Sequence, residues 1–545
     1  MAEPEYDLIL RGGTVLDGTG GPAFRADVGV CGARITAVGD LSTAQARRVL
    51  DASGLRVVPG FLDIHTHSDI SATYHPEQSS AVAMGVTTQV VGNCGLSMGL
   101  ALRTDVFGME QRWLAAHRAQ IVWGDFAEYL QFVEGQGIGT NVLSLVGHGT
   151  LRKRVMGMAD RAPDAAELRQ MQRVLEDALE AGAWGLSSGL EYPPSAFAGE
   201  EELVALCRVV AGGGGLYATH LRNEGDTLIE AVQEALRVGE RAGVAVQLSH
   251  HKAEGERNHG KVRTTLRMIE EARERGLDVQ TDQYPYPAYM TALAIQTLPR
   301  WALRGSDADM VARLRDPATR TAIREEMARL HPEWEDARAG AHWDRVRIGI
   351  CRGRPEIQGR SVRELAAEAG AHPMDYVLGL LEETEGHVSA INFSIDEGDI
   401  VTVLRYRWTA IGSDGVATRP EGATVKDMVH PRSYGTFPRV LGRYVREEGV
   451  LSEAEAVHRM TGLPAARLGL TDRGRIAAGC FADITVYDPE RVADRATFED
   501  PHRYPEGIVW VIVNGQVALE GGEPLGVRAG RVLRRGVGAG SGGVA

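Results

Sequence analysis

Two histidines separated by one residue, His65 and His67, end the apolar run FLDIHTH and are candidates for binding a metal ion. In a β-strand, residues i and i+2 point to the same face, so both imidazoles could reach one ion. The pair is a weak signal by itself, because the 16 histidines of this 545-residue chain would give roughly half an H-x-H by chance. It therefore needs support from other parts of the chain.

That support comes from four further residues, each of which ends a strand-like run. Cys94 ends TTQVVGNC, His220 ends LYATH, His250 ends AVQLSH and Asp414 ends TAIGSD. A single buried cysteine or histidine is more often structural. Recurrence at the carboxyl ends of several strands carries more weight, because the active sites of parallel barrels are built there. Thiolate and imidazole ligands with one carboxylate favour zinc.

The strands that must position these ligands alternate with amphipathic helices through the middle of the chain. Residues 164–182, for example, repeat apolar residues at helical spacing after an Asp164/Glu167 pair typical of a capping box. Repeated strand–helix units predict a parallel sheet, and about eight of them predict a closed barrel. We therefore expect an α/β fold with a TIM-type (β/α)8 barrel over residues 59–464.

The two chain ends have a different pattern. Residues 1–58 and 465–527 contain short strand-like runs with turns between them, and they predict one small β-sandwich domain formed by both ends. Asn514-Gly515 between apolar runs predicts a hairpin. The Gly-rich residues 528–545 predict a flexible tail.

One segment interrupts the barrel pattern late in the chain. Residues 288–385 are rich in Arg and Glu, contain no clear barrel strand, and predict a mostly helical insertion after the run DQYPY. The strand-like run VSAINFSI that follows could belong to the barrel or lie outside it.

Composition excludes several classes of partner. The net charge is −14, with no basic stripe, so nucleic acid is not expected to bind. No apolar run approaches the roughly 18 residues that a membrane span needs. The N-terminus lacks a signal pattern, and five widely spaced cysteines do not form a disulfide framework. These features predict a cytoplasmic protein without a membrane partner; the oligomeric state does not follow from them.

Six segments together resemble a known family: VPGFLDIHTHSD, GVTTQVVGNCG, YATHLRNEGD, LSHHK, DQYPY and IGSDG are similar to the amidohydrolase superfamily, and more narrowly to its D-aminoacylase (N-acyl-D-amino-acid deacylase) branch. The resemblance spans the barrel and includes the two-ended β domain. It implies that Cys94, His220 and His250 hold one tightly bound zinc ion. It also implies that His65 and His67 form a second, weaker or vacant metal position with Asp414 nearby.

The implied reaction is hydrolysis of the amide bond of a small N-acyl-D-amino acid. Zinc would polarise the scissile carbonyl or acidify a water molecule. Asp414, besides being a metal ligand, would be the general base that takes the proton from that water and returns it to the leaving nitrogen.

The fourth barrel strand separates this branch from its alternatives. Many superfamily members bridge two metals with a carbamylated lysine there, but AWGLSSGL contains no lysine, and Cys94 could replace it as a ligand. One zinc is therefore favoured over two equally tight metals. The missing lysine also argues against a cyclic-amide hydrolase of the hydantoinase or dihydroorotase kind. An isoaspartyl dipeptidase-like amidohydrolase stays as an alternative, and a non-catalytic scaffold is disfavoured because every candidate ligand is present.

Five residues are candidates for substrate binding. Lys252 and Arg222 each follow a candidate ligand by two residues, so on a continuing strand they would face the same way and could bind a carboxylate; a salt bridge at the rim is equally open for Arg222. Tyr192 and Tyr284 follow the fourth and seventh strands. Arg432, in HPRSYGTFPRVLG, matches the carboxylate-binding arginine of the family, and a planar guanidinium suits that role.

Overall fold

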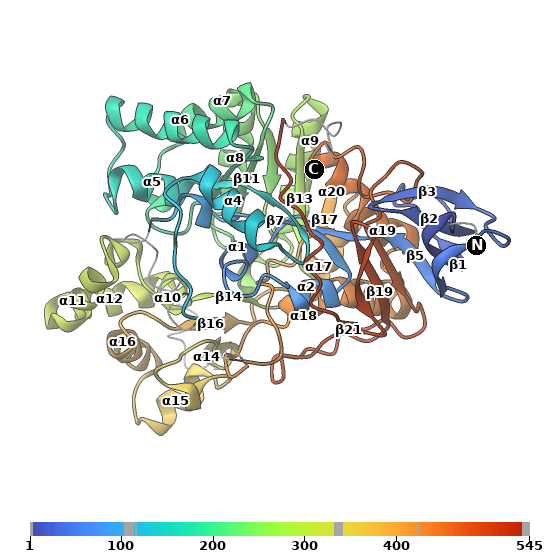
Figure 1. Cartoon of the computed structure of the whole chain (residues 1–545). Coiled ribbons are helices and arrows are strands. Elements are labelled where there is room, and N and C mark those ends of the chain that lie inside the picture. Colours follow the sequence, from blue (N-terminus) through green and yellow to red (C-terminus); the bar gives the residue numbers. More distant parts are fainter. Residues whose placement is uncertain (1–3, 103–113, 115–116, 332–341, 423–424, 537–545) are drawn as a thin grey trace.

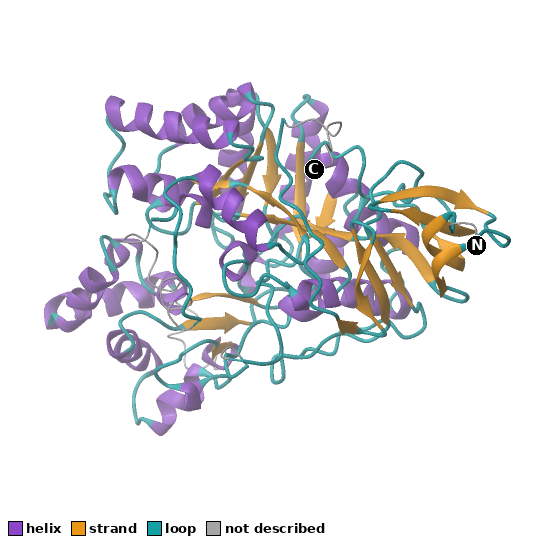
Figure 2. Ribbon diagram, viewed as in Figure 1, coloured by secondary structure: helices purple, strands orange, loops and turns teal. Residues whose placement is uncertain are grey.

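Parallel strands lie at the centre of the molecule with helices around them (Figures 1 and 2), and they are arranged as a ring made of two sheets. The computed structural model describes residues 4–102, 114, 117–331, 342–422 and 425–536. The strands of the ring are β6 (Phe61–Asp63), β7 (Val86–Val91), β8 (Asn141–Ser144), β9 (Val146–Gly147), β10 (Gly185–Gly189), β11 (Leu216–His220), β12 (Ala245–Leu248), β13 (Val279–Gln283) and β17 (Thr409–Ile411).

Hydrogen bonds divide the ring into two parallel sheets, β6–β7–β8 and β9–β10–β11–β12–β13–β17. At one junction, β8 and β9 are two pieces of one strand position, interrupted only at Leu145. At the other, the amide of Asp414 donates to His65 O at 2.8 Å and that of His67 donates to Gly415 O at 2.8 Å. The ring therefore closes directly beneath the predicted ligands, and the expected TIM-type barrel is confirmed.

Amphipathic helices cover the outside of the barrel, as the sequence pattern requires. The predicted helix over 164–182 is α6, in which the Asp164 side chain accepts from the amides of Ala166 and Glu167 as part of a capping box. None of the described helices is long and apolar enough to cross a membrane. The main outer helices are α4 (Phe126–Gln136), α5 (His148–Met156), α6 (Ala165–Glu180), α7 (Glu200–Gly212), α8 (Leu228–Ala242), α9 (Lys261–Glu274), α17 (Glu397–Arg405) and α19 (Glu453–Met460).

The insertion after β13 is mostly helical, as expected, but it also contains a small antiparallel sheet of order β14–β16–β15. The run VSAINFSI provides β16, so it lies outside the barrel. The insertion lies at the lower left of Figure 1. Its elements are β14 (Tyr289–Ala292), α10 (Leu293–Thr297), α11 (Asp307–Arg315), α12 (Pro317–Leu330), α14 (His342–Arg345), β15 (Val346–Ile348), α15 (Val362–Glu368), α16 (Pro373–Glu383) and β16 (Ser389–Asn392).

Both chain ends meet in one nine-stranded sheet at the right of Figure 1. The two ends join where β5 pairs with β18, with Pro59 opposite Ile484. Asn514 and Gly515 have φ of 47° and 82° and connect β19 to β20, which confirms the predicted hairpin. The strands are β1 (Tyr6–Val15), β2 (Phe24–Cys31), β3 (Arg34–Gly39), β4 (Ala46–Asp51), β5 (Arg56–Pro59), β18 (Ile484–Tyr487), β19 (Ile508–Val513), β20 (Gln516–Glu520) and β21 (Glu523–Pro524).

The segment after this sheet differs from the expectation of a flexible tail beginning at Arg528. Residues 528–536 are hydrogen-bonded along the barrel: Val142 N donates to Arg531 O at 2.9 Å, and Leu533 N donates to Val142 O at 2.8 Å. Backbone pairing with β8 replaces solvent for these residues, which composition alone did not reveal. Residues 537–545 lie outside the described part of the chain. The domain limits given above, including 1–58 with 465–527, remain predictions.

Candidate active site

A cavity of about 400 Å³ lies at the carboxyl ends of the barrel strands, with the insertion forming its opposite wall. Strand ends and loops of the barrel supply its polar residues, and β14, α10 and α11 supply apolar ones. Of the residues expected in the site, those that line the cavity are His67, Cys94, Tyr192, His220, His250, Lys252, Tyr284, Asp414 and Arg432.

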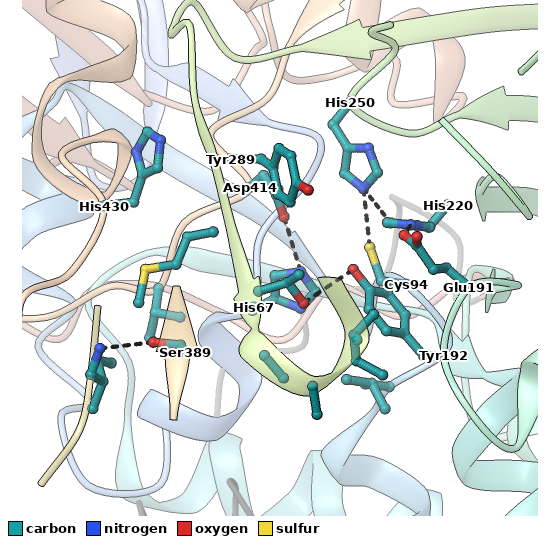
Figure 3. Close-up of a pocket in the computed structure, with 18 of the residues that line it drawn as sticks. His67, Cys94, Glu191, Tyr192, His220, His250, Tyr289, Ser389, Asp414 and His430 are labelled. Carbon is teal, nitrogen blue, oxygen red and sulfur yellow. Dashed lines mark hydrogen bonds and ion pairs between the residues drawn. The ribbon is translucent and has the colours of Figure 1, made fainter. Parts of the chain in front are cut away.

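Three expected zinc ligands converge on one point, as Figure 3 shows. The Sγ atom of Cys94 lies 3.4 Å from Nε2 of His250, and that nitrogen lies 2.9 Å from Nδ1 of His220. His65 Nε2 lies 3.3 Å from the same sulfur. The donor atoms of His65, Cys94, His250 and Asp414 lie close enough together to share one ion, and so do those of His220, Glu224 and His250. A thiol with imidazoles fits zinc.

The ionisation of Cys94 agrees with a ligand role. Burial by itself raises the pKa of the thiol, but the nearby His65 and His250 outweigh burial and hold this pKa well below its usual range. The thiolate is the form of cysteine that binds a metal.

Asp414 lies between two histidines, His65 and His67, and the guanidinium of Arg432. Its Oδ1 lies 3.0 Å from Nε2 of His67 and 3.4 Å from Nε2 of His65, and its Oδ2 lies 2.6 Å from Nη1 of Arg432. Burial raises the pKa of Asp414, but Arg432 and His250 outweigh burial and hold it well below its usual range. The carboxylate is therefore ionised and in reach of the other ligands.

Three ligand residues have strained backbones. Cys94, His250 and Asp414 have φ of 51°, 33° and 51°, in the left-handed region that non-glycine residues avoid. Such a conformation costs of order 1–3 kcal/mol and persists where the surrounding structure imposes it, often at functional sites. Each of these residues comes two or three positions after the end of a barrel strand and lines the cavity.

The sequence analysis missed three carboxylates, each of which contacts one of the buried candidate ligands His65, His220 and His250. Asp282 Oδ1 lies 3.2 Å from Nδ1 of His65, Glu191 Oε2 lies 2.9 Å from Nε2 of His220, and Glu224 Oε1 lies 3.0 Å from Nδ1 of His250. Such partners orient a metal-binding imidazole and fix which nitrogen faces the ion. The available signal was position: Asp282 lies in β13, and the other two follow β10 and β11 by a few residues.

Lys252 points into the cavity but has an acidic partner already. Its Nζ contacts Glu224 Oε2 and also lies 5.8 Å from the ring centroid of Tyr284. Burial raises the pKa of Glu224, but Lys252 outweighs it and holds this pKa well below its usual range. Lys252 thus offsets the charge of the carboxylate behind His250.

The two tyrosines lie at the ligand cluster. The ring of Tyr192 is 4.7 Å from that of His220, and the guanidinium of Arg432 lies 4.8 Å from the ring centroid of Tyr284. The hydroxyl of Tyr284 is buried, with no hydrogen-bond partner among the described residues.

Arg222 is a correction to the expected substrate-binding set. It is not among the described residues that line the cavity. Its Nε donates to Glu234 Oε2 at 2.8 Å, and its two terminal nitrogens donate to the carbonyls of Ala196 and Ala198. β11 ends at His220, so the alternation of a strand no longer applies two residues later. The plainer interpretation, a salt bridge, is the right one.

A parallel barrel with thiolate, imidazole and carboxylate groups at its carboxyl ends defines a metal-dependent hydrolase architecture. The sequence profile of the Amidohydrolase family matches residues 48–519, and this chain belongs to that family.

The relatives that match nearly the whole chain include a D-aminoacylase and deacylases named for N-acyl-D-amino acids. The chain is 40% identical to the D-aminoacylase of Alcaligenes xylosoxydans xylosoxydans, over 97% of this chain and 98% of that one. It is 40% identical to the N-acyl-D-glutamate deacylase of the same organism, over 98% and 97%. Among solved structures it is similar to the N-acyl-D-glutamate deacylase of Bordetella bronchiseptica complexed with zinc and a phosphonate mimic of the tetrahedral intermediate. The TM-score is 0.80 and the identity 36%, over 97% of this chain and 99% of that one.

Proposed function

We propose that this protein hydrolyses the amide bond of N-acyl-D-amino acids, releasing a carboxylate and a free D-amino acid. The observation that carries the proposal is the convergence of Cys94, His220 and His250 beside Asp414 in one cavity. The D-amino-acid substrates of the relatives support the choice of substrate.

Cys94, His220 and His250 would hold zinc tightly, and His65 with His67 would form a weaker second position. Bound zinc supplies a Lewis acid for the carbonyl and a water molecule of lowered pKa. Asp414 Oδ1 accepts the proton of the attacking water and returns it to the leaving nitrogen. The ion pair with Arg432 holds the carboxylate of Asp414 in the ionised form that this step needs.

Arg432 is placed to bind the α-carboxylate of the substrate. It lies beside Asp414 and over the ring of Tyr284, at the cavity wall. A free carboxylate in a buried site needs a cation or its desolvation is prohibitive, and a guanidinium can bind it while one of its nitrogens contacts Asp414. The unpartnered hydroxyl of Tyr284 offers a further donor at this place.

A cytoplasmic location belongs to the same proposal. All five cysteines, Cys31, Cys94, Cys207, Cys351 and Cys480, are free thiols, which suits a reducing compartment.

The test is a substrate screen with zinc-loaded protein, measuring amine release. N-acetyl-D-amino acids should be hydrolysed and their L-enantiomers should not. Hydantoin and dihydroorotate address the cyclic-amide alternative; because their ring opening releases a carbamoylated acid and no free amine, it is followed by chromatography of substrate and product. Hydrolysis of either one, without hydrolysis of any N-acetyl-D-amino acid, would overturn the proposal.

A further inference from the structure

A second buried polar cluster lies beside the site but outside the cavity lining. His148, the first residue of α5, has Nδ1 2.8 Å from Ser195 Oγ and Nε2 2.9 Å from Glu202 Oε1. Arg152 donates to the other oxygen of Glu202. These four side chains are at most 4% exposed. The function proposed above uses none of them.

The chemistry of the groups gives this chain of hydrogen bonds a direction. Burial raises the pKa of Glu202, but the bonds from His148 and Arg152 outweigh it and lower this pKa. The ionised carboxylate only accepts, so Nε2 of His148 carries a proton and donates it. If the second ring nitrogen carries no proton, Nδ1 is the acceptor and the hydroxyl of Ser195 donates to it.

A serine, a histidine and a carboxylate also form nucleophilic triads, but this serine has no room to attack a substrate. A methyl group added at Gly95 or at Gly149 would lie 3.1 Å from Ser195 Oγ. The Ser195 hydroxyl is therefore packed closely against the backbone at Gly95 and Gly149, and the side chain is buried. The cluster therefore has a structural role, and that role depends on the loop to which Ser195 belongs.

Ser195 belongs to the loop 190–198, which follows β10 and carries two residues of the active site. Glu191 Oε2 accepts from Nε2 of His220 at 2.9 Å, and the ring of Tyr192 lies 4.7 Å from that of His220 (Figure 3). The amide of Ala196 donates to Tyr192 O at 2.9 Å, so the turn that holds Ser195 is continuous with the turn that holds Tyr192.

We propose that the hydrogen-bonded series Glu202–His148–Ser195 positions the loop 190–198. In this position Glu191 orients His220, and the orientation of His220 determines the zinc affinity of the site. This inference rests on the proposed zinc site. A fully satisfied buried network is rigid, and a carboxylate that orients a metal-binding histidine commonly changes metal affinity by about 10–100-fold. Ser195, His148 and Glu202 are positioning residues, since they act only through Glu191.

Two substitutions of His148 separate the effect of its bond to Ser195 from that of its bond to Glu202. In His148→Gln, the amide nitrogen reaches the position of Nε2 and can still donate to Glu202, whereas Ser195 loses its acceptor. In His148→Asn, the amide oxygen takes the position of Nδ1 and can still accept from Ser195, whereas Glu202 keeps only Arg152. The measurement is the zinc dissociation constant by chelator competition, with thermal unfolding to verify the fold.

Ser195→Ala and His148→Gln should each weaken zinc binding by about 10-fold, the lower end of the range for such partners, and His148→Asn should weaken it clearly less. The matched control is Ser188→Ala. Ser188 is a buried serine on β10 that bonds to Tyr217 and Thr219 and not to the loop. The zinc affinity of the Ser188→Ala variant should therefore equal that of the wild type. Equal weakening in the control, or in both His148 variants, would assign His148 and Ser195 a general packing role and overturn the proposal.

A double-mutant cycle tests the route through Glu191. Glu191→Gln alone should weaken zinc binding, and Ser195→Ala should add nothing in that background, because the group it positions has already lost its charge. Additive losses would contradict the coupling. If the wild-type protein binds no zinc, the proposed function itself fails; if it binds zinc and Ser195→Ala binds equally well, only the positioning role fails.

Discussion

The guanidinium of Arg432 lies 2.6 Å from the carboxylate of Asp414, at Nη1 and Oδ2. The residue expected to accept a proton is thus in direct contact with the residue expected to bind the substrate's carboxylate. The two roles cannot be separated by distance, so the substitutions below are chosen to separate them by kinetics.

Asp414→Asn should abolish turnover and leave zinc bound. The amide keeps the shape of the side chain but cannot accept the proton, and loss of a general base typically lowers the rate by about 10²–10⁴-fold. Zinc content by elemental analysis and kcat on an N-acetyl-D-amino acid measure the two effects. A zinc-loaded variant with a kcat near that of the wild type would remove Asp414 from its role.

Arg432→Met should change KM differently for acid and amide substrates while lowering kcat for both. We expect KM for the free acid to rise by about tenfold or more, because a hydrogen bond to a charged group contributes about 1.5–3 kcal/mol. The KM for the matching α-amide should change little, since that substrate has no charge to bind. A common fall in kcat is expected for both, because Asp414 loses its partner. Equal increases in KM would place the carboxylate elsewhere.

Lys252→Met should destabilise the site without distinguishing acid from amide substrates. It leaves the buried Glu224 without its cation, and breaking a buried ion pair typically costs about 3–5 kcal/mol. Thermal unfolding and zinc affinity are the measurements. Adding Glu224→Gln to Lys252→Met should recover part of the lost stability, because the unpaired charge is then removed. A KM increase confined to the free acid would instead assign Lys252 to the substrate.

The side chain of the preferred amino acid should be apolar. Of the described lysines and arginines of the cavity wall, Lys252 is paired with Glu224 and Arg432 is assigned to the α-carboxylate, so neither is left for an acidic side chain. The insertion contributes an apolar wall that includes Met290, Ile295 and Met310. Burying a leucine-sized side chain contributes about 1.5–3 kcal/mol, so kcat/KM for N-acetyl-D-leucine should exceed that for N-acetyl-D-glutamate by about tenfold or more.

The control for this preference is Met290→Lys, which adds a cation to the wall and should narrow the ratio of the two kcat/KM values. A wild-type preference for the D-glutamate substrate would contradict the apolar assignment while leaving the deacylase activity intact.

The barrel and the cluster of candidate ligands were accessible to sequence reasoning because both depend on strand ends. His220 ends β11, and the ligands on other strands follow within a few residues, so apolar runs located them without knowledge of any loop. The same reasoning failed for Arg222, since strand geometry does not extend past His220.

Contacts set by loops and by short strands could not be foreseen. Glu191 reaches His220 from the loop after β10, and His148 contacts that loop at Ser195; no periodicity encodes the course of such a loop. The strands β14, β15 and β16 have four, three and four residues, too few for alternation to be distinguished from chance. The segment 528–536 is rich in arginine, and its pairing with β8 depends on a partner far away in the sequence.

The pairing of Pro59 with Ile484 sets the timing of folding during synthesis. A ribosome adds about 5–20 residues per second. The residues of β18 are therefore synthesised roughly twenty seconds to a minute and a half after those of β5. During that time the hydrogen-bonding edge of β5 and the apolar side chains of the N-terminal strands are unpaired and open to association with other chains. Conditions that slow translation or raise expression should therefore increase aggregation of nascent protein, and chaperones that bind extended apolar segments should reduce it.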